Sequence, residues 1–147
     1  KELAAKYVAA VEKFDAAYAK FNETLNKVNA EQSKKQIEKL KKDGKKGYAA
    51  AMESTLRLTE LVDKLEKAPQ NADKAAVEKE LSEIEALLKS INNDRGQVLA
   101  DRYNSVVGDV RQVLADPSDN NLNNMIEGFN GYIDTYNSTT PDQFDAK

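Results

Sequence analysis

Apolar side chains recur at helical spacing along most of this 147-residue chain. Near the start they are separated by alternating steps of three and four residues, which is the spacing of a heptad seam. This spacing predicts one amphipathic helix of about 28 residues, roughly 42 Å long. The seam consists of Ala4, Tyr7, Val11, Phe14, Tyr18, Phe21, Leu25 and Val28.

The stretch 29–47 has a different pattern, because Ile37 and Leu40 are its only large aliphatic residues. It predicts a short basic helix that starts near Ala30 and ends in a turn containing Gly44. Seven lysines against Glu38 and Asp43 give the part from 34 to 46 a local charge of +5. These lysines are Lys34, Lys35, Lys39, Lys41, Lys42, Lys45 and Lys46.

Amphipathic stripes continue to the end of the chain and are interrupted at prolines, glycines and asparagines. They predict helices over 48–67, from Asn71 or Asp73 to about residue 92, from about 94 to 116, and over 119–137. The stretch 92–96 is interpreted as a break, with Asp94 and Gln97 forming a capping box. The alternative is one continuous helix over 73–116.

No alternating pattern typical of β-strands has a useful length. Short connections between long amphipathic helices favour antiparallel neighbours. The sequence therefore predicts an all-α fold, an antiparallel four- to five-helix bundle. One domain is expected over 1–137, followed by a polar tail over 138–147, which either frays or folds back through Phe144.

The composition excludes several kinds of chemistry. The chain has no cysteine and no histidine, so thiolate nucleophiles, Ser-His triads and the usual zinc sites are absent. The acidic cluster of Glu78, Glu80, Glu83 and Glu85 lies off the apolar stripe, and we expect it to face water with ordinary pKa values. We therefore expect a protein that is not an enzyme, with no catalytic residue, no metal and no cofactor.

Two surfaces are candidates for binding. The first is basic and contains Lys34, Lys35, Lys41, Lys42, Lys45 and Lys46; it suits anionic headgroups or polymers better than nucleic acid, because it has neither arginine nor aromatic residues. The second is a groove on the last helix with Tyr132, Tyr136 and Asn137. The simpler interpretations are a solvated helix end and core aromatics beside polar boundary residues.

Charge is also divided along the chain. Residues 1–93 hold 18 basic and 16 acidic groups, whereas residues 94–147 hold 4 and 9. Such a dipolar surface is suited to orienting a protein against a charged partner.

The stretch Phe129-Asn130-Gly131-Tyr132-Ile133-Asp134-Thr135-Tyr136-Asn137, with the Lys- and Ala-rich opening 1–20, resembles mature domains of small all-helical bacterial envelope lipoproteins. The resemblance implies a location outside the cytoplasm, in the envelope or secreted fraction, and carries over no catalytic residue. Because the first residue is Lys1, we also expect a processed chain.

Together these patterns predict a non-enzymatic helical module that binds a protein or an envelope polymer through its surface. Peripheral membrane association is compatible with its lysines, and no apolar run is long enough to span a bilayer. The alternative is a carrier that holds an apolar ligand or lipid between amphipathic helices. An enzyme that uses surface carboxylates is the third hypothesis.

Overall fold

The computed structural model describes residues 30–145, with side chains from Ser33 onward. In this range the elements are α2 (Ala30–Lys42), α3 (Lys46–Lys67), the short 3₁₀ helix η1 (Pro69–Asn71), α4 (Lys74–Lys89), α5 (Asp94–Ala115), α6 (Asp119–Ser138) and the 3₁₀ helix η2 (Pro141–Asp145). The helix predicted over 4–28 lies outside the described residues.

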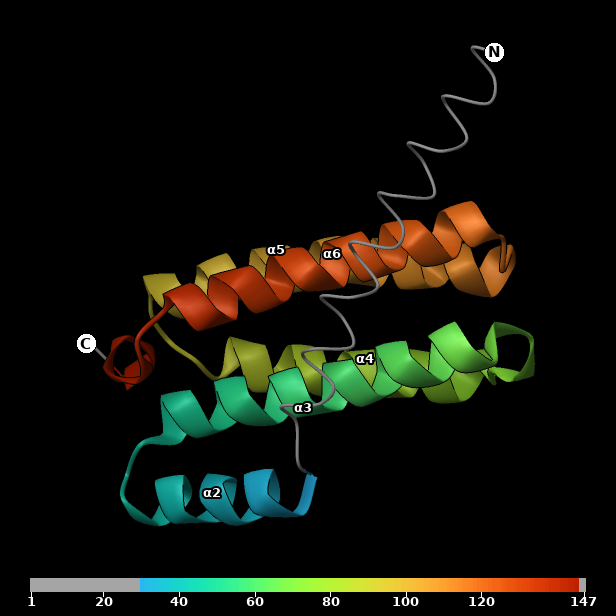
Figure 1. The fold of residues 1–147 in the computed structure, drawn as a ribbon. Helices are drawn as coiled ribbons and strands as arrows, with labels where there is room; N and C mark the ends of the chain where they lie inside the picture. Colours follow the sequence, from blue (N-terminus) through green and yellow to red (C-terminus); the bar gives the residue numbers. More distant parts are fainter. Residues whose placement is uncertain (1–29, 146–147) are drawn as a thin grey trace.

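The helices α3, α4, α5 and α6 form a four-helix bundle (Figure 1). Consecutive helices pack against each other, and α6 closes the bundle by packing on α3. In Figure 1 α3 and α4 make one layer, α5 and α6 the other, and α2 lies on the outer side of α3. The predicted all-α bundle is confirmed for the described part of the chain, where no strand occurs.

The chain breaks between α4 and α5, as the favoured interpretation predicted. α4 ends at Lys89 and α5 begins at Asp94. The predicted cap at Asp94 is wrong by one residue, because the Asn93 side chain accepts the hydrogen bond from the Gly96 N–H at 3.0 Å. Gly96 fits tightly here, since a Cβ at this position would lie 2.5 Å from the Ile91 side chain.

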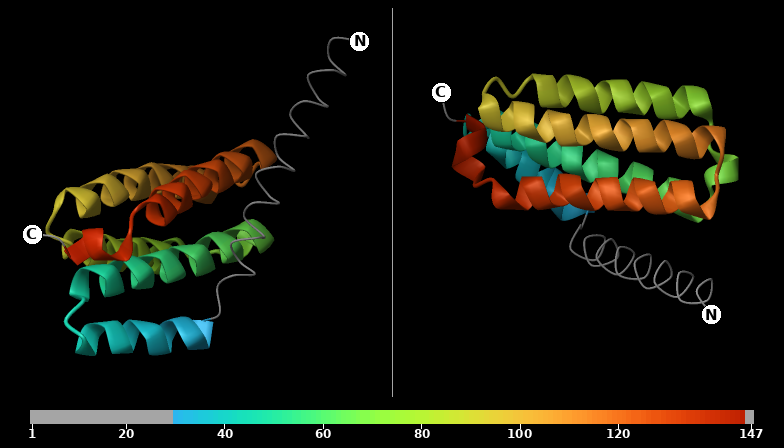
Figure 2. Two further views of the ribbon diagram at one scale, coloured as in Figure 1. Left: turned by 60° about the vertical axis from the view of Figure 1, so that its left-hand side comes forward. Right: turned by 90° about the horizontal axis from the view of Figure 1, so that it is seen from above.

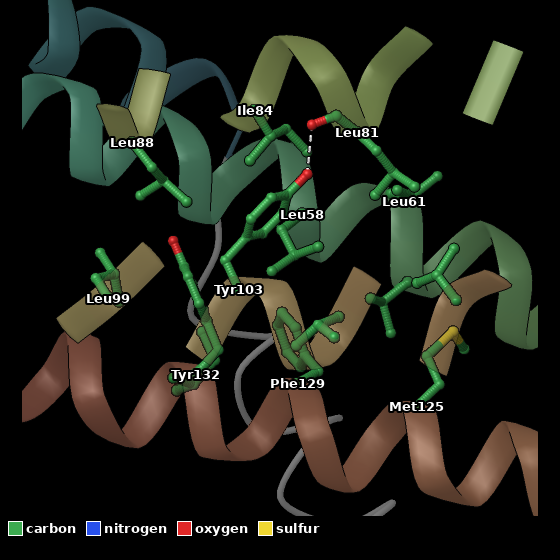
Figure 3. Packing of buried hydrophobic residues seen from close by; sticks show 14 of the residues in the cluster. Leu58, Leu61, Leu81, Ile84, Leu88, Leu99, Tyr103, Met125, Phe129 and Tyr132 are labelled. Atoms are coloured by element: carbon green, nitrogen blue, oxygen red, sulfur yellow. Dashed lines mark hydrogen bonds between the residues drawn. The ribbon is translucent and has the colours of Figure 1, made fainter. Parts of the chain in front are cut away.

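The core follows the stripes that the sequence shows. Leu58, Ile84, Leu99 and Phe129 from four different helices are fully or almost fully buried and share one cluster (Figure 3). Two polar groups inside it have partners: the Tyr103 hydroxyl donates to the Leu81 carbonyl, and the Tyr132 hydroxyl lies 3.0 Å from Thr55 Oγ1. Burial raises the pKa of both tyrosines above its usual value.

α2 is the predicted short basic helix, and it contributes a second, smaller cluster. Ile37 is buried against Ala49 and Leu56 on the outer side of α3, separately from the main core. A Schellman turn ends α2, in which the Lys45 N–H donates to the Leu40 carbonyl at 2.9 Å. Gly44 occupies the left-handed position of this turn at φ 80°. Figure 2 shows α2 lying along α3 and outside the four-helix bundle.

The end of the polar tail folds back onto the bundle, so the fraying prediction is wrong for η2. Phe144 is only 2% exposed. Its ring stacks between Tyr48 of α3 and Tyr136 of α6, with centroid distances of 6.1 and 6.0 Å. Burial of one aromatic side chain thus anchors η2, whose other residues are Pro141 and three polar ones.

The same tail caps α3. No side chain near Lys45 caps the start of that helix, and its first turn contains no acidic residue. The Asp145 carboxylate accepts hydrogen bonds from the N–H groups of Gly47 and Tyr48 at 2.7 and 3.1 Å. Negative charge at a helix N-terminus is favourable, so a residue 98 positions away supplies the missing cap.

Candidate functional site

The seven lysines of the basic segment are all exposed, but they face different neighbours. Lys41 lies 3.8 Å from Glu38 and 3.9 Å from Glu53, and Lys45 lies 3.8 Å from Asp142 of the tail. Lys46 is the first residue of α3, and Lys34 faces a groove between helices. The predicted basic residues therefore do not form one uniform patch.

Three lysines do share one face. Lys35, Lys39 and Lys42 are spaced by four and three residues, which places them on one side of α2. Ile37 and Leu40, which pack against α3, lie on the opposite side of the helix. We call Lys35, Lys39 and Lys42 the lysine face. None of the three forms an ion pair with any residue in the described part of the chain.

These lysines also have a structural role. Lys39 and Lys42 lie in the last turn of α2, where positive charge offsets the negative end of the helix dipole. That role accounts for a lysine in the last turn. The interaction of an exposed charge with the helix dipole contributes about 0.3–1 kcal/mol. It does not account for Lys35, which lies two turns earlier on the same face.

A groove runs along the outer side of α3, between α2 and the start of α4. It encloses about 860 Å³, and we call it the α3 groove. Its floor is apolar and nearly covered, consisting of Ile37, Leu56, Leu61, Leu65 and Val77. Its charged rim is formed by Lys34, Glu38, Glu53, Arg57, Glu60, Asp63, Lys64, Lys67, Asp73 and Glu80.

Sequence reasoning missed this groove, because it arises from the packing of three helices. One signal was present in α3. Leu56 lies off the stripe that faces the bundle, and together with Met52 it makes a second apolar surface on the same helix. A helix with two apolar surfaces needs neighbours on both sides.

The predicted groove on the last helix does not exist as a tyrosine-lined surface. Tyr132 is fully buried and points into the bundle (Figure 3), so it is not a surface contact. Tyr136 is half-buried against Phe144, and only Asn137 is exposed. The period of 3.6 correctly placed Tyr132 on the apolar stripe of the helix. The structure buries this stripe in the core, and the polar hydroxyl of Tyr132 is buried with it.

The acidic cluster on α4 is not simply solvated. Arg57 of α3 donates to Glu80, with Nε to Oε1 at 2.6 Å, and also to Glu83. Arg111 of α5 forms a bidentate pair with Glu78 at 3.0 and 3.1 Å, and its hydrogen bonds lower the pKa of Glu78. These carboxylates therefore tie α4 to both neighbouring helices.

One carboxyl group outside these pairs has a raised pKa. Desolvation by burial raises the pKa of Asp109 on α5, and the nearby charge of Glu127 on α6 adds to the effect. Among residues 30–145, no three acidic side chains converge as metal ligands would.

Two further findings concern the molecule as a whole. None of the helices within residues 30–145 combines the length and the apolar character needed to cross a bilayer. No protein-family model, curated protein or solved structure matches this chain.

Proposed function

We propose that this protein is a non-enzymatic binding module of the cell envelope or secreted fraction, and that its lysine face binds an anionic polymer. The observation that carries the proposal is the position of Lys35, Lys39 and Lys42. They project together from the outermost described helix, without acidic partners among the described residues.

The chemistry of the face favours a flexible polyphosphate chain over a structured nucleic acid. A lysine ammonium is a compact charge without the planar guanidinium that lets arginine form paired hydrogen bonds with a base. The stretch 30–47 also contains no aromatic residue on which a base could stack. Lys35 and Lys42 are seven residues apart, which separates them by roughly 10 Å along the helix. The face can therefore contact several charges along one chain.

The two hollows give less support to the ligand-carrier alternative. The α3 groove has a floor that is almost completely covered, and its rim is charged. The second hollow, of about 540 Å³, lies beside Lys46, Asn92 and Asp145 at the tail. A lipid site needs accessible apolar surface, whereas the floor residues of the α3 groove are at most 8% exposed.

The test compares two triple variants of equal net charge. In one, Lys35, Lys39 and Lys42 become glutamine; in the control, Lys74, Lys79 and Lys89 of α4, which are also exposed, become glutamine. Binding to fluorescent poly(glycerol phosphate) is measured by anisotropy at several salt concentrations. Each lysine near an anionic surface contributes about 1 kcal/mol, so the first variant is expected to bind roughly 100-fold more weakly.

The control variant is expected to bind within about threefold of the unchanged protein, because its lysines lie on another helix. Equal losses in both variants would contradict the proposal and indicate a nonspecific charge effect. Absence of binding by the unchanged protein at low salt would contradict it as well.

A further inference from the structure

We propose that the tail and α2 are coupled, so that the docked tail holds α2, and with it the lysine face, in place on the bundle. Both elements contact the same turn of helix, the first turn of α3, which comprises residues 46–49. The inference rests on the contacts of this turn, and it stands whether or not the lysine face binds a polymer.

The tail closes one end of the bundle. η2 lies beside the start of α3, at the same end of the bundle as the turn between α2 and α3 (Figures 1 and 2). The Phe144 ring stacks on Tyr48 of α3 and Tyr136 of α6. Asn93, which caps α5, donates to the carbonyls of Gln143 and Phe144 at 3.1 and 3.0 Å. The tail therefore joins the ends of three helices.

The first turn of α3 obtains its cap from the tail. The N–H groups of Gly47 and Tyr48 donate to the Asp145 carboxylate, and the Lys45 side chain forms no capping hydrogen bond. The contact is close, because a Cβ at position 47 would lie 2.1 Å from the Phe144 carbonyl oxygen. N–H groups without a partner weaken the end of a helix, so release of the tail favours fraying of residues 46–49.

The same turn holds α2. Ala49 follows Tyr48 directly and is fully buried, in the cluster that it forms with Ile37 of α2 and with Leu56. Side chains of successive helix residues point in different directions, about 100° apart. Tyr48 can therefore contact the tail while Ala49 contacts α2. Fraying of this turn takes Ala49 out of the cluster and loosens the attachment of α2.

The direct contact between the tail and the turn before α3 is weaker. Lys45 lies 3.8 Å from Asp142, and both side chains are exposed, so this pair contributes little. The remaining contacts of α2, with Glu53 and Leu56, lie further along α3 and do not involve the first turn. After release of the tail α2 therefore stays packed on α3, but it leaves α3 more often.

Trypsin cleavage of the full chain, at low trypsin concentration, measures how often α2 leaves the bundle. Cleavage after Lys35 and Lys39 requires this helix to unfold locally, so its rate follows the population in which α2 is detached. Asp145→Ala removes the cap directly, and Phe144→Ala removes it by releasing the tail. We expect either change to speed cleavage at these two lysines about fivefold, the factor that one lost helix cap represents. Mass spectrometry identifies the cleaved bonds, and circular dichroism checks that the bundle is folded.

Two control variants separate the coupling from other effects. Val113 is fully buried near the end of α5 that is remote from the tail, so Val113→Ala lowers the stability of the whole bundle by creating a cavity. It should leave cleavage in α2 within about twofold, because α2 unfolds without the bundle. Asp142→Ala removes only the exposed pair with Lys45 and should also leave it within about twofold.

Three outcomes would overturn the proposal. Unchanged cleavage in α2 of the folded Asp145→Ala variant would show that α2 is held independently of the tail. Equal acceleration by Asp145→Ala and Val113→Ala would show that α2 unfolds only together with the whole bundle. Equal acceleration by Asp145→Ala and Asp142→Ala would assign the effect to the charge of the tail and not to the cap of α3.

Discussion

Replacing Phe144 by alanine tests whether the tail belongs to the folded molecule. The ring is 2% exposed and stacks on Tyr48 and Tyr136, so its removal takes away a fully packed aromatic side chain. Phe→Ala changes in protein cores cost about 3–5 kcal/mol. We expect about 3 kcal/mol, at the lower end, because a terminal segment can detach instead of leaving a cavity.

The magnitude has a further consequence for Asp145. Its carboxylate caps α3 through two N–H groups, and losing a helix cap costs about 1–2 kcal/mol. Phe144 and Asp145 hold the same short segment, so releasing one releases the other. The double alanine variant should therefore lose less stability than the sum of the two single changes.

Urea denaturation followed by circular dichroism measures these differences. In a domain of this size 1 kcal/mol corresponds to about 4 °C, so Phe144→Ala should lower Tm by roughly 12 °C. Asp142→Ala is the matched control, because this side chain is 91% exposed and its pair with Lys45 is long. We expect a change below about 0.5 kcal/mol there. Equal, small effects of both substitutions would refute a docked tail.

Three further predictions concern glycine, pH and a buried hydrogen bond. Gly44→Ala should cost about 1 kcal/mol of stability, because Gly44 has a left-handed φ. Gly108→Ala, at an exposed and uncrowded helix position, should instead stabilise the protein by about 0.5–1 kcal/mol. Thermal melts of both variants check this, and a change of Tm in the same direction for both would contradict it. Burial raises the pKa of Asp109 in the folded protein. Protonated Asp109 therefore contributes to folding stability below the ordinary aspartate pKa, and this contribution is lost as pH rises through the raised pKa. Asp109→Asn should therefore raise Tm more near pH 7 than near pH 3, and a gain independent of pH would contradict the cause. Thr55→Val should cost about 1–3 kcal/mol of stability, because it leaves the fully buried Tyr132 hydroxyl without its partner. Adding Tyr132→Phe should recover part of this loss in urea titrations. A double variant that recovers nothing would exclude the hydrogen bond as the reason.

The helices were predictable because their signal is local. The stripe in α5, for example, contains Leu99, Tyr103, Val106, Val110 and Val113, and all five are buried as the period of 3.6 requires. Helix ends were less predictable. Asn93 and Asp94 are both good caps, and the difference between them depends on the contacts that Asn93 also makes with the tail carbonyls of Gln143 and Phe144.

The candidate site was less predictable, because it depends on which helices become neighbours. Exposure of the lysines follows from their position opposite Ile37, and that was visible in the sequence. The pairing of Glu80 with Arg57 was not, since the two residues are 23 positions apart and on different helices. Tyr132 shows the opposite error, because the sequence analysis placed it in a surface groove and the structure buries it in the core.

The two separate apolar clusters of α3 imply that the molecule opens in stages. Ile37, Ala49 and Leu56 form a cluster of their own, so α2 can detach while the bundle core around Leu58 stays closed. Such partial openings set the order in which amide protons exchange with solvent. The amides of α2 should exchange before those in the middle of α5, so the lysine face lies on a unit that opens before the bundle core does.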